Sequence, residues 1–95
     1  MREFEIHFVT QAPGPAGHAE KTVTEIGTQY WKMKCAAAIE WLKGDPHTFY
    51  IRIGERKVYL VAPLRDGQAW LRTSLEWSEP NRLLELPGFP ADFGK

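Results

Sequence analysis

Hydrophobic and polar residues alternate along several short segments of the chain, which is typical of β-strands with one buried face. The alternation runs from Phe4 to Phe8 and predicts a strand over residues 3–10. Residues 21–26 are short and rich in β-branched residues, so we expect a second strand there. Between the two strands, residues 11–20 contain prolines and glycines that oppose both helix and strand, which predicts a flexible loop.

A different repeat marks residues 33–43, where apolar side chains recur with the spacing of an amphipathic helix. Consecutive alanines in this segment have the best intrinsic helix propensity. Gly44 fits the left-handed position that ends many helices, and Pro46 cannot continue one. The apolar stripe of the predicted helix is formed by Cys35, Ala38, Ile39 and Leu42.

Strand-like segments follow the helix in close succession, at residues 48–53, 57–62 and 68–73. Short turns connect them, and the second turn holds an Asp-Gly pair that favours a tight hairpin. Such short connections force neighbouring strands to be antiparallel, which predicts a meander. We expect the helix to pack its stripe on the side chains of Phe49, Ile51, Val58 and Leu60.

Together these elements predict a single α+β domain over residues 1–95, with the order β-β-α-β-β-β. We expect a small antiparallel sheet of about five strands with one helix packed on one face. Leu83, Leu84 and Leu86 would promote aggregation if they were exposed, so we expect them to cover a sheet end or edge. Prolines and glycines predict an irregular tail over residues 88–95.

Length and charge are consistent with this fold and reduce the number of function classes that the chain could belong to. The 95 residues suffice for one small domain, and 43% hydrophobic residues can form its core. Lys plus Arg and Asp plus Glu are 12 each, so no excess of basic charge argues for binding to nucleic acid or anionic membranes. No apolar stretch is long enough to span a bilayer. The lone Cys35 suits a reducing compartment and residues 1–5 lack the apolar core of a signal peptide, so we expect a cytoplasmic protein with no membrane partner.

Five pieces of the sequence form a pattern through their order and spacing. They are Trp31, Ala38-Ile39 followed by Gly44, His47-Thr48-Phe49-Tyr50-Ile51, Trp70-Leu71-Arg72-Thr73, and Leu83-Leu84-Glu85-Leu86-Pro87. With these pieces the chain resembles the short bacterial domain-of-unknown-function family 3892 over residues 22–87. It departs from the family where Ser74-Leu75-Glu76 stands in place of an aspartate and where Arg82, rather than asparagine, precedes Leu83. The resemblance implies a small single domain without an assigned activity, and it supplies no catalytic residue.

Few residues suggest chemistry. His7, His18 and His47 are scattered and there is one cysteine, which is not the spacing of a zinc site, so we expect no metal and no cofactor. Cys35 lies on the apolar stripe, where burial raises the pKa of a thiol, and a Cys35–His47 couple stays open as a nucleophilic arrangement. A small enzyme site around His47 and Arg72 is the second alternative for the function.

Charge is uneven between Arg52 and Arg72, where five basic residues minus two acidic residues leave three positive charges. Tyr50 and Tyr59 alternate with these cations on the strand face opposite Phe49. Exposed rings beside basic side chains can bind single-stranded nucleic acid by stacking and phosphate contacts. Cross-strand pairs on an ordinary sheet surface have the same pattern. A single-stranded nucleic-acid binder is therefore the first alternative.

The leading hypothesis is a non-catalytic interaction module that associates with itself or with another protein. A small antiparallel sheet has unpaired edges, and aromatic residues are frequent contact anchors. Trp41 lies about 200° from Ile39 around the predicted helix, so we expect it to be the most exposed tryptophan. Trp31 precedes the helix, where its ring can pack at the chain entry. The candidate interaction surface consists of Trp41, Tyr50, Arg52, Arg56, Lys57 and Tyr59.

Overall fold

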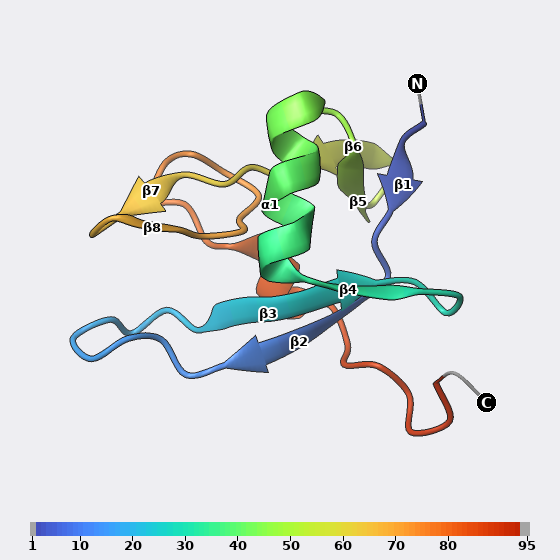
Figure 1. Cartoon of the computed structure of the whole chain (residues 1–95), viewed down its shortest axis with the longest axis horizontal. Coiled ribbons are helices and arrows are strands. Elements are labelled where there is room, and N and C mark those ends of the chain that lie inside the picture. The colour runs from blue at the N-terminus through green and yellow to red at the C-terminus, as the bar shows by residue number, and fades with distance from the viewer. Residues whose placement is uncertain (1, 94–95) are drawn as a thin grey trace.

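The structure, a computed structural model, describes residues 2–93, and in this range it has one α-helix and eight short strands in three small sheets (Figure 1). The elements in chain order are β1 (Phe4–Glu5), β2 (Phe8–Ala12), β3 (Thr22–Gly27), β4 (Lys32–Lys34), α1 (Cys35–Gly44), β5 (Phe49–Ile53), β6 (Arg56–Tyr59), β7 (Leu64–Arg65), β8 (Gln68–Ala69) and the 3₁₀-helix η1 (Arg82–Glu85). The sheets have the orders β1-β5-β6, β2-β3-β4 and β7-β8. The α+β class with a helix on a sheet is confirmed, but the expected single sheet is divided into three.

The strand predicted over residues 3–10 is divided between two sheets. β1 pairs with β5 in parallel, whereas β2 pairs with β3 antiparallel, so the expected all-antiparallel arrangement is wrong at β1. The backbone N–H of Ile6 donates to Tyr50 O at 2.8 Å, and the next N–H, of His7, donates to Gly27 O at 2.9 Å. The chain therefore changes sheets between these two residues. The backbone is hydrogen-bonded to a strand both before and after this point, so the alternation of side chains does not reveal the change of sheet.

Strand β4 is absent from the sequence prediction, and it moves the start of the helix. Met33 and Lys34 belong to β4, which pairs antiparallel with β3, so α1 begins at Cys35 rather than at residue 33. Lys34 makes no side-chain capping bond, and the helix continues directly from the strand. The helix ends within one residue of the predicted end, but Gly44 is its last helical residue and lacks the positive φ of the left-handed stop expected there.

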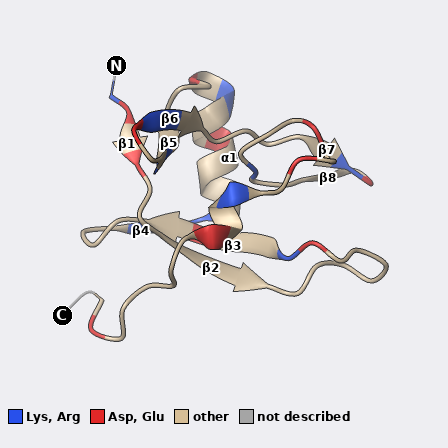
Figure 2. Cartoon of the chain, turned by 180° about the vertical axis from the view of Figure 1, so that it is seen from behind, with Lys and Arg blue, Asp and Glu red and all other residues tan. Residues whose placement is uncertain are grey.

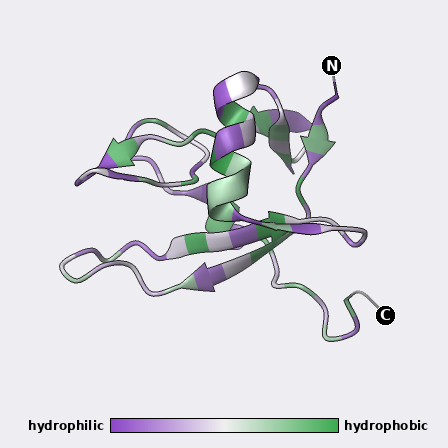
Figure 3. Cartoon of the chain, in the orientation of Figure 1, coloured by the Kyte–Doolittle hydropathy of each residue, from purple (hydrophilic) through white to green (hydrophobic). Residues whose placement is uncertain are grey.

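The hydrophobic core lies where α1 meets the sheets. Figure 3 shows hydrophobic segments between hydrophilic ones along α1, as expected of an amphipathic helix. Ala38 is fully buried, and the other residues of the predicted stripe are half-buried. The predicted helix and sheet residues all belong to one core, together with Ile6, Val9, Val23, Ile26, Leu71 and Leu83. α1 also lies against β3 and β4, because the two three-stranded sheets share this core.

The predicted three-stranded meander is only half correct. β5 and β6 form the expected hairpin around a turn at Gly54, which has a positive φ of 64°. β8 does not join β6 but pairs with β7 in a separate hairpin. Asp66 and Gly67 both have positive φ in its turn, which is the geometry of a tight two-residue hairpin. Beyond β8, Arg72 forms an isolated antiparallel bridge with Val61, which follows β6 in the chain.

The Leu-rich segment covers an edge of β2, as predicted. Leu83 is fully buried in η1, and Leu84 and Leu86 are half-buried against the core. The backbone N–H of Val9 donates to Pro87 O at 3.1 Å, so the tail occupies an edge position beside β2. Residues 88–93 contain no helix or strand, and residues 94–95 of the predicted irregular tail lie outside the described residues.

Candidate functional site

Trp41 lies on the last turns of α1 and presents its indole ring to solvent. Its residue is 56% exposed, whereas Trp70 is buried and Trp31 and Trp77 are half-buried. Trp41 is therefore the most exposed of the tryptophans, as the helical spacing predicts. An exposed indole is unusual because burial of such a ring contributes strongly to stability.

An open hollow of about 850 Å³ lies beside this ring, and we call it the Trp41 hollow. One wall comes from the N-terminal segment, with Arg2 and Phe4, and Thr48 also lines the hollow. The opposite wall is the C-terminal end of α1, which contributes Glu40, Trp41, Gly44 and Asp45. The hollow thus joins a helix end to the segment that carries β1.

The walls of the Trp41 hollow are fixed by bonds to the sheet. The N–H of Phe4 donates to Thr48 O at 2.8 Å, and the Thr48 hydroxyl donates to Asp45 O at 2.6 Å. The Phe4 ring packs edge-on against Trp31, with centroids 5.8 Å apart, and Trp31 also contacts Phe49. Trp31 therefore packs on aromatic side chains of β1 and β5 rather than at the entry to α1, from which β4 separates it. Both walls are held before any partner binds.

The charges around the Trp41 hollow are of both signs. Glu40 forms an ion pair with Lys43 at 2.6 Å. The guanidinium of Arg2 lies 5.7 Å from the centre of the Phe4 ring, a cation–π contact. Within residues 2–93, neither Arg2 nor Asp45 has an ion-pair partner, although Asp45 Oδ1 accepts the N–H of His47 at 2.9 Å. One wall therefore carries an unpaired cation and the other an unpaired carboxylate.

A second surface is formed by the aromatic and basic residues of β5 and β6. Tyr50 lies opposite Tyr59, and Arg52 lies opposite Lys57, so the structure brings these predicted residues together. Lys57 Nζ lies 4.6 Å from the centre of the Tyr50 ring. Tyr50 is only 9% exposed, which corrects the expectation of an open stacking ring. Arg56 lies at the start of β6 and is exposed.

Two of the three cations of this second surface, Arg52 and Lys57, are paired with acidic residues of β1 and the residue before it (Figure 2). Glu3 accepts from Lys57 Nζ at 2.6 Å and from the Tyr59 hydroxyl at 2.9 Å, and these two hydrogen bonds lower the pKa of Glu3. The same carboxylate raises the pKa of Lys57. Glu5 lies 3.4 Å from Arg52 Nε. The local excess of positive charge seen in the sequence is therefore largely compensated by β1 and the residue before it.

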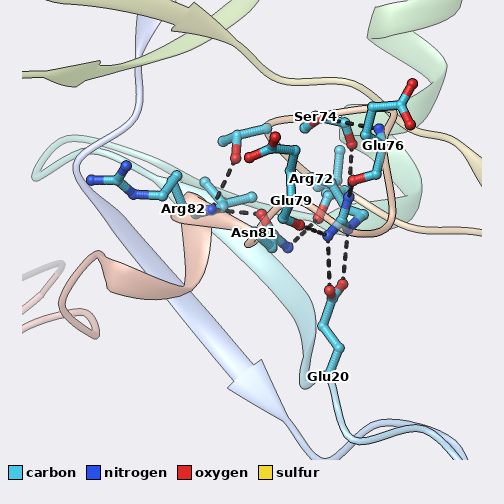
Figure 4. A network of polar contacts seen from close by, with 10 residues as sticks. Glu20, Arg72, Ser74, Glu76, Glu79, Asn81 and Arg82 are labelled. Carbon is cyan, nitrogen blue, oxygen red and sulfur yellow. Dashed lines mark hydrogen bonds and ion pairs between the residues drawn. The ribbon is translucent and has the colours of Figure 1, made fainter.

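Arg72 has a structural role, unlike the catalytic role that the second alternative for the function would give it. Its side chain is fully buried and all five of its N–H groups donate (Figure 4). Two hydrogen bonds reach the carboxylate of Glu20, and three reach the carbonyl oxygens of Ser74, Glu76 and Glu79. This geometry gives no support to the alternative of an enzyme site around His47 and Arg72, because Arg72 has no donor left for a substrate.

His47 and Cys35 are also apart from each other. His47 is exposed, and its ring packs on Tyr59 with centroids 4.5 Å apart. Cys35 begins α1 and His47 follows its end, so the helix length of about 15 Å separates them and the proposed couple does not form. Burial raises the pKa of the Cys35 thiol, which keeps it protonated at neutral pH.

Sequence reasoning does not single out Glu20, and it does not predict the contact that His18 makes. Both belong to the predicted flexible loop, yet Glu20 pairs with Arg72, and His18 Nε2 lies 3.0 Å from Asp66. Their partners lie 52 and 48 positions away, so no local pattern could indicate them.

Several further features bear on the function. Within residues 2–93, no group of three His, Cys, Asp or Glu side chains is placed to hold a metal ion. The helix in this range is too short and too polar to cross a membrane. Comparisons of the chain with protein families, curated proteins and solved structures find no match.

Proposed function

We propose that the chain is a non-catalytic protein-interaction module that binds its partner through the Trp41 hollow. The observation that carries the proposal is an indole ring, 56% exposed, beside an open hollow of about 850 Å³. Tryptophan is enriched among the few residues that dominate binding energy at protein interfaces. Removing such a ring from water contributes roughly 25 cal/mol per Å² of apolar surface. A cytoplasmic location, which the single thiol favours, is part of the proposal, as is the relationship to family 3892.

The fixed walls of the Trp41 hollow support this role. A surface that is already ordered loses little conformational entropy on binding, so more of the contact energy appears as affinity. Trp41 stands on a helix, and Phe4 and Thr48 are joined by a backbone hydrogen bond. The other large exposed apolar side chains, Tyr30, Leu64 and Leu75, lie outside this hollow. Isolated exposed side chains of this kind are ordinary on protein surfaces.

The nucleic-acid alternative has weaker support. Stacking of bases needs an accessible ring, and Tyr50 is covered by Lys57 and Arg52. Phosphate contacts need free cations, and these two side chains are matched by Glu3 and Glu5. We expect short single strands to show no salt-dependent binding in a fluorescence anisotropy titration at two salt concentrations. Tight binding at low salt that weakens with salt would restore this alternative.

A photo-crosslinking residue in place of Trp41 tests the proposed function. Benzoylphenylalanine at position 41 carries an aromatic group into the same place, and we expect it to give one discrete covalent adduct in the cells that naturally make the protein. Mass spectrometry of the adduct identifies the partner and the position that it contacts.

The matched control places the same crosslinker at Leu75, which is also exposed, at 64%, but lies outside the hollow. We expect no discrete adduct from position 75. The same adducts from both positions, or none from position 41, would contradict a specific contact at the Trp41 hollow.

A further inference from the structure

We infer that the partner is a second copy of this chain, bound about a twofold axis so that Trp41 of each copy lies in the Trp41 hollow of the other. This inference rests on the proposed function, because it names the partner of the same surface. In such an isologous interface every contact occurs twice: if one residue of the first copy contacts a different residue of the second, the reverse contact also forms. The surface must therefore be complementary to itself.

The charges of the Trp41 hollow satisfy that condition. Arg2 stands on one wall and Asp45 on the other, and within residues 2–93 neither forms an ion pair. A twofold rotation places the Arg2 wall of one copy against the Asp45 wall of the other. Two reciprocal ion pairs, Arg2 with the other copy's Asp45 and the reverse, then form at the rim around the apolar centre.

The balance of charge favours a second copy over a strongly charged partner. The Glu40–Lys43 pair is internally neutral, and Arg2 and Asp45 cancel, so these four side chains together carry no net charge. The whole chain also has a formal net charge of zero, so two copies do not repel at long range. An acidic or basic protein would pair with only one of the two walls and would face a like charge on the other.

The two indoles meet near the axis in this arrangement. Trp41 forms part of its own hollow, so the ring that enters from the other copy packs against it. Aromatic rings in contact prefer offset or edge-to-face packing. Paired indoles in fixed geometry give an exciton couplet in far-ultraviolet circular dichroism, and this signal reports the Trp41 pair directly.

Sedimentation velocity of the pure protein over a wide concentration range is the first measurement. We expect a monomer–dimer equilibrium, with an exciton couplet that grows as the dimer forms. Trp41→Ala should raise the dissociation constant at least about tenfold and remove the couplet. Leu75→Ala removes an exposed apolar side chain outside the hollow and should leave both unchanged. Thermal melting of each variant checks that it is folded.

Exchange of the rim charges tests the twofold pairing itself. Arg2→Asp alone leaves only acidic groups facing each other, and Asp45→Arg alone leaves only basic ones, so each variant should dimerise more weakly than the original chain. An equimolar mixture of the two restores both ion pairs and should form a mixed dimer. If Asp45→Arg melts far below the original chain, Asp45→Asn takes its place, because its side-chain oxygen can still accept the N–H of His47 while its charge is lost, and it should also dimerise more weakly than the original chain.

The outcomes separate the two proposals. A chain that stays monomeric at millimolar concentration, while the crosslinker at position 41 captures a different protein, overturns self-pairing and leaves the interaction module standing. A monomer with no adduct from position 41 overturns both. A dimer that survives Trp41→Ala, or charge variants that fail to recover when mixed, places the dimer contact elsewhere and overturns this interface.

Discussion

Glu20 and Arg72 lie 52 positions apart in the sequence and form a two-point ion pair, in which Nε and Nη2 of Arg72 donate to the two carboxylate oxygens at 3.0 and 2.9 Å. The guanidinium is fully buried, and its centre also lies 4.6 Å from the centre of the Trp77 ring. This pair ties the loop before β3 to the segment after β8 (Figure 4). Both segments lack regular structure of their own, so the ion pair fixes them in place.

Glu20→Ala should therefore lower the free energy of unfolding by about 3 to 5 kcal/mol, since it leaves a buried cation without its counter-ion. Urea denaturation measures this change. Glu55→Ala, in the exposed turn between β5 and β6, is the control and should change stability little. A loss below about 1 kcal/mol for Glu20→Ala, the range of surface ion pairs, would show that the pair has no structural role.

Neighbouring alanines of α1 give a second matched test. Ala38 is fully buried and Ala37 is exposed. Ala38→Asp buries a carboxylate without a partner and should unfold the domain, as judged by circular dichroism and melting. Ala37→Asp should lower stability by about 0.7 kcal/mol or less, the difference in helix propensity. Equal effects at the two positions would mean that α1 is rotated from the described orientation.

The closing leucines provide the third test. Leu83 is completely buried, and Leu83→Ala should lower the free energy of unfolding by about 2 to 5 kcal/mol through lost burial and a cavity. Leu75→Ala makes the same chemical change at an exposed position and should have little effect. Removal of residues 80–95 should destabilise the domain further, because it also uncovers the edge of β2. An unchanged melting temperature after the truncation would mean that the tail does not stabilise the fold.

Acid should weaken the contact between Glu3 and β6. The hydrogen bonds from Lys57 and Tyr59 lower the pKa of Glu3, so its ionised form stabilises the folded state above the ordinary carboxyl pKa. This contribution is lost as the pH falls through that value to the lowered one. We expect Glu3→Gln to be less stable than the original chain at neutral pH and equal to it in acid. Urea midpoints measured at several pH values test this, with Glu55→Gln as the control.

The sequence predicts what local spacing determines. The end of α1 is predicted within one residue, the β5–β6 hairpin follows from alternation around a short turn, and the exposure of Trp41 follows from its angle on the helix. The same local reasoning does not find β4, because a strand of Lys32–Lys34 is too short to show alternation. It also gives β8 the wrong neighbour, since alternation indicates a strand but not its partner.

The errors at the candidate sites have a different physical origin. An arginine in a strand-like segment resembles a surface residue, and only the fold brings Glu20 and three carbonyl groups around Arg72. Likewise, the sequence shows an excess of cations between Arg52 and Arg72, and the structure places Glu3 and Glu5 beside two of them. Such pairings depend on contacts between segments that are far apart in the sequence, and neither composition nor periodicity indicates them.

The parallel pairing of β1 with β5 has a consequence for how the chain folds. The hairpins β2–β3, β5–β6 and β7–β8 each join neighbouring segments, so they close small loops and can form early. Phe4 lies opposite Phe49, and this contact closes a loop that contains the helix and three other strands. The entropy lost in closing a loop rises with its length, so we expect β1 to dock late in folding. During synthesis, β1 leaves the ribosome before β5, so it cannot pair until β5 has also been made.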